Sequence, residues 1–190
     1  ASPGLASCRR RPLSSNVRRL NSQLSFDHMK IRPAHESDAP VLAMLISESN
    51  KDVALQFGIT AENCPKHPSF CRPEWLAHDF TRGEIYFIAY AAGQPIACVA
   101  TEYPSPEIAY LNRLAVLPAH RKQGVGASLV NFILAQARVR AAKTVSIGVI
   151  GEHAALQDWY KRFGFVSGET KHFPHLPFSV KYMAHELADA

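Results

Sequence analysis

The sequence predicts an α+β (α/β layered) fold built on a mixed, mostly antiparallel central sheet. Three strand-like segments follow one another over residues 85–117 with short turns between them, which is typical of an antiparallel meander. A helical pattern then lies between two strand-like segments, and such a crossover unit joins parallel strands. Two more strand-like segments near the end would complete the sheet as an antiparallel pair. The elements run without an internal repeat or linker, so residues 29–190 are predicted to form one domain.

The N-terminal part of that domain is predicted to hold one strand and two helices. Residues 30–33 form a short strand, and residues 37–40 supply a helix N-cap followed by a proline in the first turn. Apolar side chains at helical spacing carry this helix to about Ser49, while residues 53–57 form a separate, weakly patterned segment. Two prolines make residues 62–72 a loop before a second helix begins at residue 73.

The remaining elements alternate between strands and helices. The expected strands cover residues 85–91, 96–103, 108–117, 144–150, 165–169 and 178–183. One helix is expected from Val125 to about Arg140, and another over residues 153–163, where apolar side chains recur at helical spacing. Gly164 follows as the C-terminal stop of this last helix.

Composition and charge exclude several classes of protein. The chain of 190 residues is 47% hydrophobic and 19% charged, as in ordinary globular proteins. Of its net charge of +5, residues 1–28 contribute +4, with five arginines against one acid. The domain at 29–190 therefore lacks the basic field of a nucleic-acid binder, and we expect no nucleic-acid partner. No apolar run approaches the roughly 18 residues of a membrane span, so we expect no membrane partner.

Residues 1–28 are rich in Arg and Ser and poor in large apolar side chains, which is typical of a disordered extension. Two interpretations stay open: an artefact upstream of a start at Met29, or a genuine organellar transit peptide. The cysteines are Cys8, Cys64, Cys71 and Cys98. They are too sparse for a disulfide framework, so we expect reduced thiols and a cytoplasmic location, or an organellar one if the leader is genuine.

A basic, glycine-containing loop enters the helix at Val125. Gly124 and Gly126 allow the backbone to approach a ligand closely, and the first N–H groups of the helix lack intrahelical partners. Such a junction favours an anion, and Arg121 and Lys122 add positive charge. The stretch is therefore predicted to hold a phosphate group.

This loop (RKQGVG, from Arg121), the element order and the later sequence WYKRFGF, from Trp159, together resemble the GNAT (Gcn5-related N-acetyltransferase) family. The family has an R/Q-x-x-G-x-G/A loop after its fourth strand and a Y-x-x-x-G-F element further on. The resemblance implies a GNAT fold, with helices on both faces of the sheet and fourth and fifth strands that splay apart. It also implies acetyl-CoA as cosubstrate, a small-molecule or peptide amine as acceptor, and a possible homodimer.

The resemblance assigns cofactor-binding residues. The pantetheine arm would pair with the backbone of Leu114, Ala115 and Val116. The pyrophosphate would be bound by the backbone amides of Gln123, Gly124, Val125, Gly126 and Ala127. Arg121 and Lys122 would lie near the phosphates. His153 stands where the family often has a cofactor-contacting Asn.

The implied reaction is direct attack of an amine on the thioester in a ternary complex. It requires a neutral amine, a polarised carbonyl and a proton for the departing sulfur. By resemblance, a backbone N–H near Val116 polarises the carbonyl and Tyr160 protonates the thiolate. Glu102, at the end of a strand, is the candidate base, acting through water. Alternatives stay open: Tyr160 as a core residue, Glu102 as an exposed turn carboxylate, and the whole chain as a catalytically silent acyl-CoA sensor.

A last pattern is Cys64-x-x-His67-x-x-x-Cys71, whose spacing also suits a zinc ion if completed by His78 or by His172 and His175. Because prolines already make this loop rigid, we predict no metal. The resemblance instead places residues 63–70 at the acceptor pocket. Residues 171–178 either close the same pocket or only fill a turn.

Overall fold

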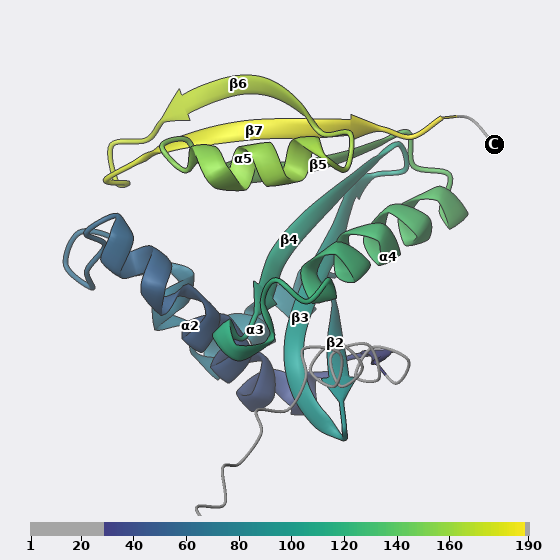
Figure 1. Cartoon of the computed structure of the whole chain (residues 1–190), viewed down its shortest axis with the longest axis horizontal. Coiled ribbons are helices and arrows are strands. Elements are labelled where there is room, and N and C mark those ends of the chain that lie inside the picture. Colours follow the sequence, from purple (N-terminus) through teal and green to yellow (C-terminus); the bar gives the residue numbers. More distant parts are fainter. Residues whose placement is uncertain (1–28, 189–190) are drawn as a thin grey trace, which may run out of the picture.

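The computed structural model describes residues 29–188, in which seven strands form one mixed sheet with helices on both faces (Figure 1). The strands are β1 (Lys30–Pro33), β2 (Ile85–Ala91), β3 (Gln94–Ser105), β4 (Ile108–Val116), β5 (Thr144–Ile150), β6 (Val166–His172) and β7 (Ser179–Glu186). The helices are η1 (Glu36–Asp38), α2 (Ala39–Gln56), η2 (Pro68–Phe70), α3 (Pro73–Thr81), η3 (Pro118–His120), α4 (Val125–Val139) and α5 (Ala154–Lys161). The predicted α+β fold is confirmed. The expectations for residues 1–28 lie outside the described residues.

The strands lie in the order β1-β2-β3-β4-β5-β7-β6, and every neighbouring pair is antiparallel except β4 and β5. The predicted meander is β2-β3-β4. Its first turn has positive φ at Ala92 (49°) and Gly93 (77°), as a two-residue hairpin turn requires. The predicted crossover is β4-α4-β5, which supplies the parallel pair.

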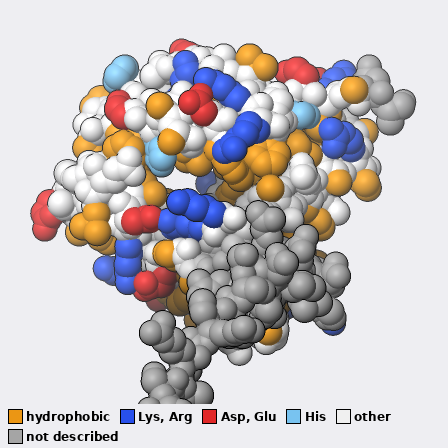
Figure 2. Space-filling view, in the orientation of Figure 1, with side chains coloured by type: hydrophobic (Ala, Val, Ile, Leu, Met, Phe, Trp, Pro, Cys, Tyr) orange, Lys and Arg blue, Asp and Glu red, His pale blue; other side chains and the backbone are white. Residues whose placement is uncertain are grey.

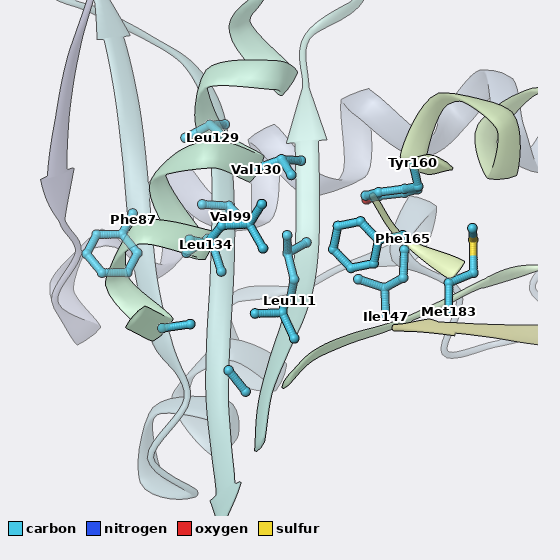
Figure 3. Packing of buried hydrophobic residues seen from close by; sticks show 14 of the residues in the cluster. Phe87, Val99, Leu111, Leu129, Val130, Leu134, Ile147, Tyr160, Phe165 and Met183 are labelled. Atoms are coloured by element: carbon cyan, nitrogen blue, oxygen red, sulfur yellow. The ribbon is translucent and has the colours of Figure 1, made fainter. Parts of the chain in front are cut away.

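Two hydrophobic layers hold the helices against the sheet. On one face, α2 and α3 bury Leu42, Leu45, Ile46 and Leu76 against side chains of β2 and β3. On the other face, α4 buries Leu129 and Val130 against Val99 and Leu111, and Figure 3 shows these side chains packed together. Since both faces of the central strands are covered, β2 and β3 are apolar almost throughout rather than alternating.

The sheet opens where β4 leaves β5. The two strands pair only between residues 108–110 and 144–146, and Figure 1 shows β4 running away from β5 beyond that point. The register of β4 against β3 shifts between Cys98 and Ala100, opposite Arg113, whose φ is 52°. This β-bulge bends β4, and bulges are common beside functional sites. The predicted splaying of the fourth and fifth strands is confirmed, and it leaves one edge of β4 without a strand partner.

One helix boundary was predicted wrongly. α2 continues from Ala39 to Gln56, so the segment at 53–57 belongs to it rather than standing alone. No glycine or proline interrupts the chain until Gly58, and the buried Ala54 keeps the last turns packed. No helix in the part of the chain that the structure describes is both long and apolar enough to cross a membrane.

Candidate active site

The glycine loop ends β4 and starts α4 with free N–H groups. Gly124 is the N-cap residue and has a φ of 86°, a left-handed conformation that favours glycine. The first hydrogen bond of the helix joins the Ser128 N–H to the Gly124 carbonyl at 2.9 Å. The N–H groups of Val125, Gly126 and Ala127 are therefore left without intrahelical acceptors. These donors, together with the positive end of the helix dipole, form a site suited to a phosphate group.

The same loop borders a cavity of about 380 Å³ between α2, the end of β4 and α5, which we call the β4–α5 cavity. It is lined by Ser49, Asn50, Asp52, Val53, Gln56, Leu114, Ala115, Val116, Arg121, Lys122, Gly124, Gly126, Ala127, His153, Leu156 and Trp159. Figure 2 shows this face of the molecule hollowed, with Lys and Arg side chains at the rim. The free N–H groups and the unpaired edge of β4 thus belong to one cavity.

Most of the predicted cofactor-binding residues line this cavity, and two do not. The Gln123 side chain turns away and donates to the Ala119 carbonyl at 2.9 Å. The Val125 side chain is buried in the core beneath α4. Both residues can serve the cavity only through their backbone amides, which is the role that the resemblance implied. Sequence reasoning missed the contribution of α2, because nothing in its pattern distinguishes a cavity-facing turn from an exposed one.

Arg121 is already fully engaged by neighbouring groups. Its Nε donates to the Val116 carbonyl at 3.1 Å and its Nη2 to the Ser49 carbonyl at 2.6 Å. The guanidinium also makes a two-point ion pair with Asp52, which lowers the pKa of that carboxyl. Lys122 is exposed and has no hydrogen-bond or ion-pair partner within residues 29–188. Arg121 therefore braces the loop against α2, and Lys122 is the cation left available to a phosphate.

Tyr160 lies on α5 above the opening in the sheet. Its ring packs edge-on against Trp159 and Phe165, with centroid distances of 4.9 and 5.4 Å. Figure 3 shows the side chain reaching from α5 over Phe165 toward β4. Burial raises the pKa of the phenol, and the structure gives its hydroxyl no hydrogen-bond partner among the residues described. The phenol is therefore protonated at neutral pH and free to donate.

The end of α5 fixes this position. Gly164 has a φ of 82°, and the Phe165 N–H returns to the Tyr160 carbonyl at 3.4 Å. At the other end, His153 is the N-cap residue, and its Nδ1 accepts from the Leu156 N–H at 3.3 Å. Trp159 lies within 3.4 Å of where a Cβ on Gly126 would stand. A side chain there would be in van der Waals contact with Trp159, so α5 packs closely on the glycine loop.

Comparison with known proteins agrees with this geometry. Residues 82–167 match the family described as "Acetyltransferase (GNAT) domain", a stretch that includes β4, the glycine loop and α5. This part of the chain is thus similar to GNAT acetyltransferases. The chain is also 28% identical, over 90 residues, to an uncharacterized N-acetyltransferase of Methanocaldococcus jannaschii. That match spans 44% of this chain and only 40% of the relative.

Solved GNAT structures share the fold at low sequence identity. PaiA N-acetyltransferase from Thermoplasma acidophilum, in complex with coenzyme A, is similar with a TM-score of 0.69 at 18% identity, over 84% of this chain and 99% of that one. The ribosomal-protein-S18-alanine N-acetyltransferase of Escherichia coli gives 0.68 at 17%, over 85% and 96%. A GNAT acetyltransferase from Elizabethkingia anophelis with acetyl-CoA bound gives 0.63 at 16%, over 85% and 99%.

Glu102 lies apart from the β4–α5 cavity. It pairs across the sheet with Tyr110, at a level where β4 is still bonded to β5. Its carboxylate is 28% exposed and lies 4.0 Å from the Arg82 guanidinium. Neither Glu102 nor Tyr160 is among the residues that line the β4–α5 cavity, so the structure does not bring the two together there.

A buried polar cluster behind the bulge of the GNAT sheet was not foreseen from the sequence. Asp79 accepts from the Tyr86 hydroxyl at 2.8 Å and lies 3.4 Å from both Arg82 and Arg113. The neighbouring Glu84 accepts from Asn112 at 2.9 Å, and burial raises its pKa. The cluster borders a second cavity of about 430 Å³, here called the α3 cavity. It is lined by Lys66, Glu74, Trp75, His78, Asp79, Arg82 and Arg113.

The two segments expected at the acceptor pocket contact each other. His67, on the loop before α3, lies with its ring centroid 6.5 Å from that of Phe178, on the loop before β7. Its Nδ1 accepts from the Ser69 N–H at 3.2 Å, and burial lowers its pKa. Within residues 29–188 no three His, Cys, Asp or Glu side chains are grouped so as to hold a metal ion.

Proposed function

We propose that this chain is an acetyl-CoA-dependent N-acetyltransferase that transfers an acetyl group to a primary amine in a ternary complex. The observation that carries the proposal is the continuity of the β4–α5 cavity. It joins the free N–H groups at the start of α4 to the unpaired edge of β4. The free N–H groups can hold a pyrophosphate, and the unpaired strand edge can pair with an amide-containing arm. CoA carries a pyrophosphate followed by such an arm.

The cosubstrate is assigned to the cavity as follows. The backbone at 114–116 pairs with the pantetheine arm, and the amides at 123–127 bind the pyrophosphate with help from Lys122. Arg121 acts indirectly, because its donors hold the loop against α2. His153 lines the cavity at the N-terminus of α5, so a contact with the cofactor is part of the proposal.

In the proposed reaction the amine nitrogen attacks the thioester carbonyl carbon, the C–N bond forms and the C–S bond breaks. A backbone N–H near Val116 stabilises the oxygen that becomes negative. The Tyr160 hydroxyl gives its proton to the departing sulfur, and the proton released by the amine restores the tyrosine through water. Glu102 is retained as candidate base only by way of intervening water, since its carboxylate does not line the cavity.

Primary amines of small molecules and of peptides both fit the proposal. The similarity to the ribosomal-protein-S18-alanine N-acetyltransferase supports testing peptide N-termini along with small amines.

The decisive test replaces Gly124 by Glu. The new carboxylate would repel the pyrophosphate at the start of α4, so we expect the Kd for CoA to rise about tenfold or more. Calorimetric titration with CoA measures this Kd, and thiol release with acetyl-CoA and a panel of amines measures transfer.

Gly93→Glu is the matched control. Gly93 also has positive φ (77°) and open space around it, but lies in the β2–β3 turn. The site would be refuted if both variants bound CoA equally more weakly than the original protein. It would also be refuted if the original protein and both variants all failed to bind CoA. Binding without transfer to any amine would instead favour the acyl-CoA sensor.

A further inference from the structure

Arg113 occupies a position that is energetically unfavourable for its backbone. With a φ of 52° it adopts the left-handed region, which ordinary side chains rarely populate and which costs about 1 kcal/mol or more. Its side chain is only 24% exposed and points to the face of the sheet covered by α3, where it meets Asp79. The bulge that opens the sheet thus also delivers a guanidinium to the α3 cavity.

This guanidinium has hydrogen-bonding capacity that its described neighbours do not use. A guanidinium carries five N–H donors, and the hydrogen bond that the structure shows for Arg113 is a long one of 3.4 Å to Asp79. Burying a charged group with so few partners is unfavourable. The remaining donors belong to a group that lines a cavity of about 430 Å³.

The acids of the cluster are, by contrast, already engaged. Asp79 receives the Tyr86 hydroxyl at 2.8 Å as well as contacts from Arg82 and Arg113. Glu84 accepts hydrogen bonds from Asn112 and Arg82, and it does not line the cavity. The lining also carries Glu74, which has no hydrogen-bond or ion-pair partner among residues 29–188, but Lys66, Arg82 and Arg113 outnumber Glu74 and Asp79 there. An anionic group entering the α3 cavity would meet the unused donors of Arg113, with Lys66 also on the lining.

Consecutive residues of β4 line the α3 cavity and the β4–α5 cavity. Arg113 lines the former and Leu114 the latter. We propose that the α3 cavity receives the acceptor and that Arg113 binds a carboxylate of it, so that the preferred acceptors are amines that also carry a carboxylate. This inference rests on the proposed transferase function, because it assigns the second substrate of the same site. The carboxylate comes either from a free amino acid or from an acidic side chain next to a peptide N-terminus.

The test compares acceptors that differ only in that group. One arm pairs free amino acids with their carboxamides, and the other pairs tripeptides with Asp or Glu at the second position with their Asn or Gln counterparts. With acetyl-CoA saturating, we expect kcat/KM of the original protein to favour the acid about tenfold to a hundredfold in one arm. The arm that shows the preference identifies the source. Arg113→Gln should reduce the acid-to-amide ratio to near one. Arg72→Gln should preserve it, because Arg72 is an exposed arginine at the N-cap of α3 and lies outside the cavity.

A binding measurement keeps the inference independent of catalysis and of the variant's stability. Trp75 lines the α3 cavity, so its fluorescence reports the titration of each acid and each amide into the CoA-loaded protein. Acids that bind at least tenfold more tightly than their amides support the inference even if no acetyl transfer is seen, and a variant that fails to fold leaves this comparison intact. Equal binding and equal kcat/KM for acids and amides overturn it while leaving the transferase proposal standing. Failure of the proposed function would show separately, as absence of CoA binding.

Discussion

At the scale of single residues, burial keeps the Tyr160 phenol protonated, as the proton donor that we propose would have to be. The ring packs against Trp159 on α5 and against Phe165, which directly precedes β6. Its hydroxyl has no described hydrogen-bond partner. Removing a phenol from water disfavours its ionised form, so its pKa rises. A group with a raised pKa is protonated throughout the neutral range, which suits an acid that must meet a newly formed thiolate.

Tyr160→Phe should therefore lower kcat about a hundredfold or more, the usual contribution of a general acid, and leave the Kd for CoA nearly unchanged. The decline of kcat at high pH that depends on Tyr160 should begin above the ordinary tyrosine pKa of about 10, because burial shifts the ionisation upward. Thiol release followed from pH 6 to 11 measures both effects. The control is Phe163→Leu, at a half-buried aromatic residue just past the end of α5 that packs against Trp159. An unchanged kcat in Tyr160→Phe would assign the residue to the core alone.

At the scale of elements, Arg121 ties together three parts of the chain. It connects the glycine loop to the carbonyl that ends β4, through Val116, and to the last turns of α2, through Ser49 and Asp52. The partners on α2 lie about 70 residues earlier in the sequence. The position of α2 and the shape of the anion site are thus coupled through one guanidinium.

Asp52→Asn should weaken this connection. We expect the free energy of unfolding at pH 7 to fall by about 0.5–1 kcal/mol, since the carboxylate is half exposed and screened by water, and the Kd for CoA to rise a few-fold. Because Arg121 lowers the pKa of Asp52 in the folded protein, the carboxylate stabilises the fold above its ordinary pKa near 4. That contribution is lost as the pH falls further, so the two proteins should converge in acid.

Chemical denaturation from pH 7 to pH 2.5 measures the difference. Glu48→Gln is the matched control, because it removes an exposed ion pair with Lys51 from the same helix without touching the loop. A difference between Asp52→Asn and the original protein that persisted undiminished at pH 2.5 would contradict the electrostatic explanation.

At the scale of the whole molecule, local sequence patterns predicted the sheet and its helices because turns, caps and apolar periodicity are encoded nearby. Gly164 and Gly124 are examples, since positive φ favours glycine and marks an element's end. The bulge at Arg113 could not be foreseen, because an arginine at positive φ gives no local signal. Likewise, the sequence showed Arg121 beside a phosphate loop but not its partner Asp52, since pairing across the fold is decided by tertiary packing.

The opening between β4 and β5 divides the sheet into two parts that CoA is expected to bridge. The strands are bonded to each other only over residues 108–110 and 144–146, so the edge of β4 at 114–116 lacks strand partners. If the pantetheine arm pairs with that edge, the backbone amides at 114–116 should exchange hydrogen more slowly in the presence of CoA.

CoA should also stabilise the fold. At a CoA concentration a hundredfold above Kd, binding adds about 2.7 kcal/mol to the free energy of unfolding, which for a domain of this size raises Tm by roughly 5–10 °C. Hydrogen exchange and thermal unfolding measure the two effects. Gly124→Glu should lack both responses to CoA, and Gly93→Glu should keep them. A rise in Tm with slowed exchange at the glycine loop but not at 114–116 would place the arm elsewhere, because phosphate binding alone protects only the start of α4.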